Sequence, residues 1–244
     1  MAQRKIHGMG TLYLIRHGQA SFGAADYDDL SELGRRQGRM LGRFLAGAGI
    51  RFDACWSGSL RRQRQTAAET AESYRQAGIT MPRPSENPVF DEYDYETVLR
   101  TLIPIILEED PAFGKAVDNM LSDRRMFQNV FGRVMIRWAS GRDRLDGLPS
   151  WKGFCSRAAA GIQEMLNGCP GGSRVAVFTS GGPIAAMVGH VLGLAPETAI
   201  SLSWQLVNAS ITCFKFSRGR TGLDTFNEKA HLAPPAGDGL VTYR

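Results

Sequence analysis

The sequence predicts an α/β fold, because segments with the pattern of strands alternate along the chain with segments that have the pattern of helices. The first observation is an apolar run at 12–15, which has the composition of a strand buried on both faces. The second is the helical spacing of large apolar side chains over 31–46, with glycines near 47–49 expected to end that helix. The third is the strand-like segment 174–179, after which Pro183 favours the first turn of a helix.

The remaining elements continue the alternation. Residues 52–56 indicate a second short strand, and 60–77 the helix that follows it. Pro82, Pro84 and Pro88 then enforce an extended loop. We expect a further helix at 152–166, and a final hairpin formed by 211–216 and 223–226.

The segment 97–142 has no strand pattern, and we interpret it as a helical cap over the pocket. Its apolar face would consist of Phe127, Val130, Phe131, Val134 and Trp138. Pro104 is expected to kink or end its helix. The alternative is an additional packing layer far from the site. Residues 1–244 are expected to form a single domain that contains this segment as an insertion.

Composition argues against several classes of protein. The four cysteines lack metal-finger spacing and the four histidines lack metal-ligand spacing, so we expect no metal, no cofactor and reduced thiols. The formal charge of +5 is modest and scattered, which does not favour nucleic-acid binding. Without an apolar run of membrane-spanning length or a signal region, the expected location is cytoplasmic, with no membrane partner. Homo-oligomerisation is left open.

The strand at 12–15 ends in the tripeptide Arg16-His17-Gly18. In open α/β sheets, ligands bind at the carboxyl ends of the strands. A guanidinium beside an imidazole suits binding a phosphoryl group and accepting it on nitrogen. Gly18 would let the backbone turn and let a ligand approach closely. The tripeptide also occurs by chance, so it decides little without support from other segments.

That support comes from segments 30–34 with Gln37, 56–67, 90–93 and 179–184. Together with the tripeptide, and in this order, they resemble the histidine phosphatase superfamily, also called phosphoglycerate mutase-like proteins. The resemblance runs from about residue 12 to about residue 212. It implies a three-layer sandwich in which helices flank a mostly parallel central sheet, with a helical insertion.

The resemblance also implies a phosphatase that hydrolyses phosphomonoesters through a phosphohistidine on His17. Arg16 and Arg62 would clamp the phosphoryl oxygens, as bidentate forks do. Glu92 would protonate the leaving oxygen and then activate water, which requires a raised pKa. The partner would be a small phosphorylated substrate or phosphate itself. Further contacts to it would come from Gly18, Gln19, Ser21, Ser180 and Gly181.

One position departs from the family pattern. Where the family has a second histidine before the glycines, this chain has Ser180. His190 lies too far along the following helix to replace it, and His231 is a remote substitute. Losing one donor to the transition state typically costs about 10²–10³ in rate. We therefore expect a slow phosphatase rather than an efficient mutase. The alternative is a weakly active or inactive phosphate-binding or regulatory module of the same fold.

Two further alternatives concern single side chains. Cys55, with Gly58 and Arg61, fits the Cys-x-x-Gly-x-x-Arg pattern of cysteine-dependent phosphatases, and a loop of N–H groups could lower the pKa of a thiol there. Asp91 and Asp94 flank Glu92, so all three could belong to a plain acidic loop. Within the basic cluster, Arg61 and Arg64 are expected to lie on the solvated surface.

Overall fold

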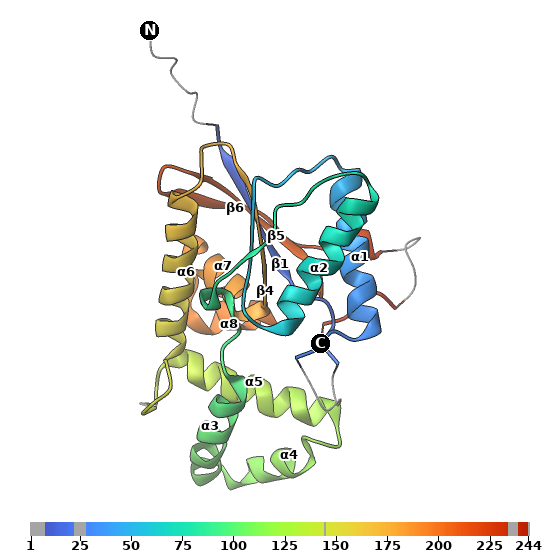
Figure 1. Cartoon of the computed structure of the whole chain (residues 1–244). Helices are drawn as coiled ribbons and strands as arrows, with labels where there is room; N and C mark the ends of the chain where they lie inside the picture. The colour runs from blue at the N-terminus through green and yellow to red at the C-terminus, as the bar shows by residue number, and fades with distance from the viewer. Residues whose placement is uncertain (1–7, 22–27, 144, 234–238, 244) are drawn as a thin grey trace.

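The structure, a computed structural model, describes residues 8–21, 28–143, 145–233 and 239–243 (Figure 1). Its described strands form one sheet with the order β3-β2-β4-β1-β5-β6. The four strands β1, β2, β3 and β4 run parallel, and β5 and β6 add an antiparallel edge. The strands are β1 (Gly10–Arg16), β2 (Ala54–Ser57), β3 (Ser85–Glu86), β4 (Arg174–Thr179), β5 (Ile211–Ser217) and β6 (Arg220–Glu228).

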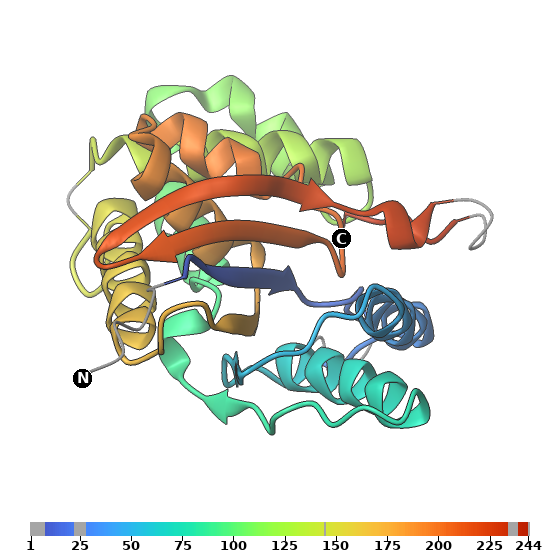
Figure 2. The same cartoon turned by 90° about the horizontal axis from the view of Figure 1, so that it is seen from above.

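Helices cover both faces of this sheet, as Figure 2 shows from above. The helices α1 (Glu32–Gly47) and α2 (Arg61–Gln76) cover one face, while α6 (Trp151–Asn167) and α7 (Gly181–Leu192) cover the other. The helix α8 (Pro196–Ser203) packs on α7. Alternate residues of β1 enter the two cores: Leu12 and Leu14 pack with α6 and α7, and Ile15 with α1 and α2. The predicted three-layer sandwich is therefore confirmed.

Most of the predicted strands and helices lie within two residues of their expected bounds. The start of α7 is one of the small differences. Pro183 was expected to open this helix, but α7 begins at Gly181 after Ser180. Proline is tolerated at the third helical position because the N–H groups of the first turn have no partner within the helix. The N–H groups of Gly181 and Gly182, which have no partner within the helix, consequently follow the end of β4 after a single residue, Ser180.

The middle of the chain is helical. It contains α3 (Tyr95–Glu109), α4 (Gly114–Asn119) and α5 (Arg124–Ser140), and short 3₁₀ turns stand at Pro88–Phe90, Pro111–Phe113 and Ala230–Leu232. Pro104 was expected to kink or end its helix. It lies inside α3 and does not end it, because Leu102 and Ile106 on either side of it are buried in the core. Their packing outweighs the lost backbone hydrogen bond. Phe127 is partly buried, and the other residues of the predicted apolar face are buried: Val130, Phe131, Val134 and Trp138.

Among the described residues, no helix combines the length and the apolar character needed to cross a membrane.

Candidate active site

His17 follows β1 directly, and the sheet fixes its backbone. Its N–H donates to the carbonyl oxygen of Thr179 over 2.9 Å, and its carbonyl oxygen accepts from the Ala209 N–H at 3.1 Å. The ring Nδ1 lies 2.7 Å from the carbonyl oxygen of Gly18. A carbonyl oxygen only accepts, so this contact assigns the proton to Nδ1 and leaves the lone pair on Nε2.

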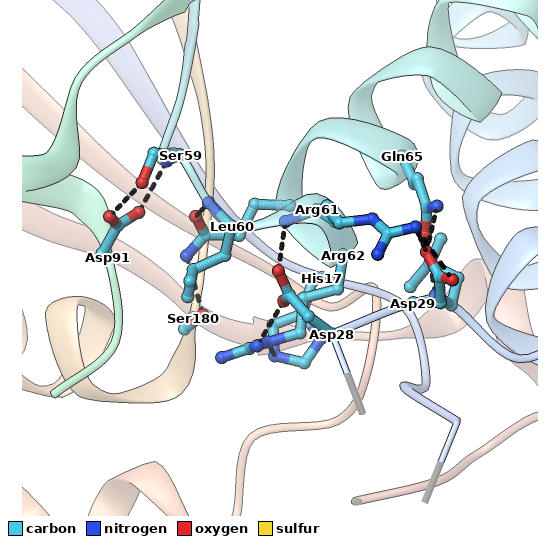
Figure 3. Close-up of polar contacts among 12 residues, drawn as sticks. His17, Asp28, Asp29, Ser59, Leu60, Arg61, Arg62, Gln65, Asp91 and Ser180 are labelled. Carbon is cyan, nitrogen blue, oxygen red and sulfur yellow. Dashed lines mark hydrogen bonds and ion pairs between the residues drawn. The ribbon is translucent and has the colours of Figure 1, made fainter. Parts of the chain in front are cut away.

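Arg62, in the first turn of α2, contacts this nitrogen. Its Nε donates to Nε2 of His17 over 3.2 Å, as Figure 3 shows. Burial, followed by the guanidinium groups of Arg62 and Arg16, holds the pKa of His17 well below its ordinary value of 6.5. The imidazole is therefore neutral at physiological pH, which is the state that a nitrogen nucleophile requires.

A carboxylate that the sequence did not single out also lies at the start of α2. Asp28 Oδ1 is 2.6 Å from Nη1 of Arg62, and Asp28 Oδ2 accepts from the backbone N–H of Arg61 at 2.7 Å (Figure 3). The positive end of the helix dipole favours an anion there. The side chain of Arg62 is only 9% exposed, whereas Arg61 and Arg64 are exposed, as predicted for solvated cations.

Glu92 reaches the same place from the loop before α3. Its two carboxylate oxygens accept from the backbone N–H of Gly182 at 3.0 and 3.1 Å. Burial raises the pKa of Glu92 above its ordinary value of 4.5, against the opposing effect of this hydrogen bond and of nearby guanidinium groups. The next residue, Tyr93, packs its ring against Trp138 and Trp151 with centroid distances of 4.9 and 5.9 Å. That packing fixes the loop that carries the carboxyl.

The two acids that flank Glu92 make structural hydrogen bonds. Asp91 accepts from the backbone N–H of Ser59 at 2.6 Å and from its hydroxyl at 2.5 Å, and Asp94 caps α3 by accepting from the Thr97 N–H at 3.0 Å. Both carboxylates are thus engaged in holding the backbone. Only Glu92 of the three lines the cavity described next, so the loop is more than a plain acidic stretch.

A cavity at the carboxyl ends of β1 and β4 brings these groups together. Its described lining consists of Arg16, His17, Ala20, Arg62, Glu92, Tyr93, Tyr95, Phe127, Phe131, Gly181, Ser203, Trp204 and Asn208. Arg16 is held there by a hydrogen bond from its guanidinium to the carbonyl oxygen of Leu206. Because α5 contributes Phe127 and Phe131, part of the 97–142 segment lies on this cavity. The interpretation that the segment packs far from the site therefore fails.

Comparison with known proteins gives the family. The model of the histidine phosphatase superfamily (branch 1) matches residues 12–119 and 123–229. The chain belongs to this superfamily. Relatives that it resembles include a 2,3-bisphosphoglycerate-dependent phosphoglycerate mutase of Methylorubrum populi, 28% identical over 199 residues, which are 78% of this chain and 83% of the relative. A mutase of the same name from Methylobacterium sp. is 38% identical over 74 residues, covering 28% and 36% of the two chains.

Solved structures have the same fold and bear the names of both phosphatases and mutases. A phosphoserine phosphatase mutant of Entamoeba histolytica, solved with phosphoserine, is 20% identical with a TM-score of 0.63, and the match covers 92% of this chain and all of that one (100%). A phosphoglycerate mutase of Bacillus anthracis is 19% identical with a TM-score of 0.60, covering 92% and 96%. A mycobacterial glucosyl-3-phosphoglycerate phosphatase is 21% identical with a TM-score of 0.60, covering 90% and 99%.

The residues that the histidine phosphatase resemblance singled out separate into two groups. The four expected to carry the chemistry, together with Gly181, line the cavity; Gly18, Gln19, Ser21 and Ser180 do not. Gly18 allows a close approach of the chain to itself, since a Cβ there would lie 2.4 Å from the carbonyl oxygen of Gly34. The backbone N–H of Gln19 donates to Gln37 at 2.8 Å. Gly18 and Gln19 therefore hold the loop after β1 against α1, and this contact supports the position of His17.

Ser180 is fully buried, and its hydroxyl is turned into the interior. Its Oγ accepts from Nε2 of Gln63 at 2.8 Å, and the same nitrogen donates to the carbonyl oxygen of Phe90 at 3.1 Å. His231 does not replace the missing histidine. Its Nε2 binds the carbonyl oxygen of Ala209 at 3.0 Å, its ring stacks on Phe44, and burial lowers its pKa to about 4.

The structure contradicts the cysteine-dependent alternative. Cys55 lies inside β2, buried in the core between the sheet and the helices α1 and α2. Burial raises the pKa of its thiol to about 12, so it carries almost no thiolate at physiological pH. Within the described ranges there is also no group of three or more side chains that could hold a metal ion.

Sequence reasoning missed three polar residues around the site. Asn208 donates from Nδ2 to the His17 carbonyl oxygen over 3.2 Å although 191 positions separate the two residues, and no local pattern signals such a contact. Asp28 likewise belongs to no motif that the sequence analysis recognised. Gln63 could have been found, because it stands on the buried stripe of α2 with Ala67 and Thr70, where an amide needs partners.

Proposed function

We propose that this chain is a phosphatase that hydrolyses phosphomonoesters through a phosphohistidine on Nε2 of His17. The observation that carries the proposal is the assigned state of the ring, with its proton on Nδ1 facing the Gly18 carbonyl oxygen and a lone pair on Nε2 beside Arg62. A carboxyl whose pKa is raised by burial, that of Glu92, lines the same cavity. Together they are the nucleophile and proton donor that phosphoryl transfer needs.

In the first step, the Nε2 lone pair attacks phosphorus and the bond from phosphorus to the ester oxygen breaks. The proton of Glu92 goes to that oxygen, so an alcohol leaves. In the second step, the Glu92 carboxylate takes a proton from water, whose oxygen attacks phosphorus as the P–N bond breaks. Arg16 and Arg62 offset the charge of the phosphoryl oxygens, and the first N–H groups of α7 at Gly181 add to this field.

Hydrolysis is favoured over a mutase reaction by the charges of the cavity. The related mutases of Methylorubrum and Methylobacterium are named for bisphosphoglycerate, which carries two phosphates and a carboxylate. Among the described residues that line this cavity, Arg16 and Arg62 alone carry a permanent positive charge. Two guanidinium groups match one phosphoryl group and leave a second anion unpaired. The four cysteines have free thiols, which is consistent with a cytoplasmic phosphatase.

The test is to trap the intermediate. Rapid alkaline quenching after mixing with a labelled phosphomonoester, drawn from a screen of phosphorylated metabolites and phosphopeptides, should give an acid-labile, base-stable phosphate on His17. The His17→Ala variant, checked for folding by circular dichroism, should form no such adduct and show no turnover. Hydrolysis that survives in folded His17→Ala overturns the mechanism. Tight binding of inorganic phosphate without turnover of any ester would instead identify the chain as a phosphate-binding or regulatory module.

A further inference from the structure

One wall of the cavity is aromatic. It consists of Tyr95 at the start of α3, Phe127 and Phe131 on α5, and Trp204 after α8. The ring of Phe131 is central: its centroid lies 5.8 Å from that of Phe127, 6.0 Å from that of Tyr95 and 6.4 Å from that of Trp204. Phe127 and Phe131 are four positions apart and so share one face of α5. The four rings therefore form one continuous surface, which we call the aromatic wall.

Three of the four residues of the aromatic wall keep part of their surface exposed. Tyr95, Phe127 and Trp204 are only partly buried, although all of them pack against the core that joins α3, α5 and α8. Apolar surface that stays accessible inside a cavity is characteristic of a ligand site, since covering it with an apolar ligand group removes it from water. In Figure 1, α3 and α5 lie in the same lobe, below the sheet.

Few charged side chains belong to the described lining of the cavity. Within the part of the lining that the structure describes, the charged side chains are Arg16, Arg62 and Glu92, which belong with His17 to the phosphoryl site. No lysine or further arginine of that lining accompanies the aromatic wall. A carboxylate or second phosphate on the leaving group would lose its water there without gaining a cation, which is unfavourable.

Resting on the phosphatase activity proposed above, we infer that the substrate is a phosphate monoester of an alcohol that carries an uncharged aromatic ring. The phosphoryl group would occupy the arginine end, and the ring would pack on the aromatic wall in an offset or edge-to-face arrangement with Phe127 and Phe131. Phe127 and Phe131 are therefore the residues of the 97–142 segment that select the substrate. Esters of glycerate or glycerol, which are charged or polar, match the aromatic wall poorly.

The experiment compares esters whose leaving alcohols have similar basicity, so that the chemical step is matched. We expect kcat/KM for 2-phenylethyl phosphate to exceed that for glycerol 3-phosphate and for 3-phosphoglycerate by about ten-fold or more, the range for apolar groups in a fitted pocket. The variant Phe127→Ala should remove most of that advantage, and Phe127→Lys should shift the preference toward 3-phosphoglycerate. Ile136→Ala is the matched control, since Ile136 is an exposed apolar residue of the same helix and does not line the cavity.

A binding measurement separates failure of this inference from failure of the phosphatase proposal. Calorimetry with non-hydrolysable 2-phenylethyl phosphonate and methyl phosphonate does not depend on turnover. The ring should tighten binding by about ten-fold, and Phe127→Ala, but not Ile136→Ala, should abolish the difference. Equal affinity of the two phosphonates, or equal kcat/KM for all the esters, overturns the inference while leaving the phosphatase intact. Ring-dependent binding without hydrolysis of any ester supports the inference and overturns the phosphatase.

Discussion

Gln63 and Ser180 form a buried pair in which the amide Nε2 donates to the hydroxyl oxygen over 2.8 Å, and both side chains are fully excluded from solvent. The same amide nitrogen also donates to the carbonyl oxygen of Phe90, two residues before Glu92. The pair therefore joins the first turn of α2, the end of β4 and the loop of Glu92. It lies at the position where the family pattern has its second histidine.

This pair makes a simple restoration of the histidine unfavourable. We expect Ser180→His alone to lower the free energy of unfolding by about 1–3 kcal/mol, because an imidazole overpacks the space that Gln63 fills and removes one of the two acceptors of its buried amide. Combining it with Gln63→Ala should recover part of this loss. A double-mutant cycle by urea denaturation measures the coupling. Strictly additive effects would show that the two residues do not share the space.

The pH dependence of kcat/KM should reflect two groups whose pKa values are shifted in opposite directions. Attack requires unprotonated His17, whose pKa is lowered by burial, and protonated Glu92, whose pKa is raised by burial. For alkyl phosphates, kcat/KM should therefore fall at acid pH as His17 gains a proton and at alkaline pH as Glu92 loses one. Phosphoenzyme formation from 4-nitrophenyl phosphate should lack the alkaline fall, because its leaving group needs no proton.

Glu92→Gln is the control for that assignment. In this variant the alkyl esters should react slowly and without the alkaline fall. Both kinds of ester are already dianions at alkaline pH, so ionisation of the phosphate group does not contribute to the alkaline fall. If the alkaline fall persists in Glu92→Gln, a group other than Glu92 causes it.

Arg62 should be indispensable and Cys55 dispensable. Arg62→Ala removes a buried guanidinium that contacts His17 and lines the phosphoryl site, so we expect kcat/KM to fall about 100-fold or more, since each hydrogen bond to a charged group contributes about 1.5–3 kcal/mol. Arg64→Ala, at an exposed position of the same helix, should leave activity unchanged. Folded Cys55→Ser should retain turnover, measured with the same ester. Loss of turnover in Cys55→Ser and retention in Arg62→Ala would refute the histidine assignment.

Gly182 should be required for the position of Glu92. A Cβ at this residue would lie 2.0 Å from Oε1 of Glu92 and 2.8 Å from Cδ1 of Tyr93, so Gly182→Ala displaces the carboxyl. Turnover of alkyl phosphates should fall about 100-fold, as expected for loss of a general acid, and turnover of 4-nitrophenyl phosphate much less. Gly47→Ala, where nothing lies within 4 Å of the added carbon, is the control and should behave like the parent. An equal loss for both esters would indicate general damage to the site.

The sequence by itself determined the order of most strands and helices, because apolar periodicity, glycines and prolines act over a few neighbouring residues. The short strand β3 and the helix α8 were not predicted. The sequence also pointed to Arg16 and His17, which follow a buried strand directly, because ligands bind at the carboxyl ends of the strands in open α/β sheets. Arg62 and Glu92, which line the same cavity, were found through the resemblance to the histidine phosphatase superfamily.

Only the tertiary structure decided what surrounds those residues. The pairing of Gln63 with Ser180 joins positions 117 apart in the chain, and the direction of a side chain at such a contact has no local pattern. The aromatic wall combines Phe127 and Phe131 of α5 with Trp204 after α8, which periodicity alone describes only as core-facing residues. Pro104 remains inside α3 because long-range packing outweighs a local propensity. Contacts between distant segments are set by how the layers pack, and that packing is a property of the folded chain as a whole.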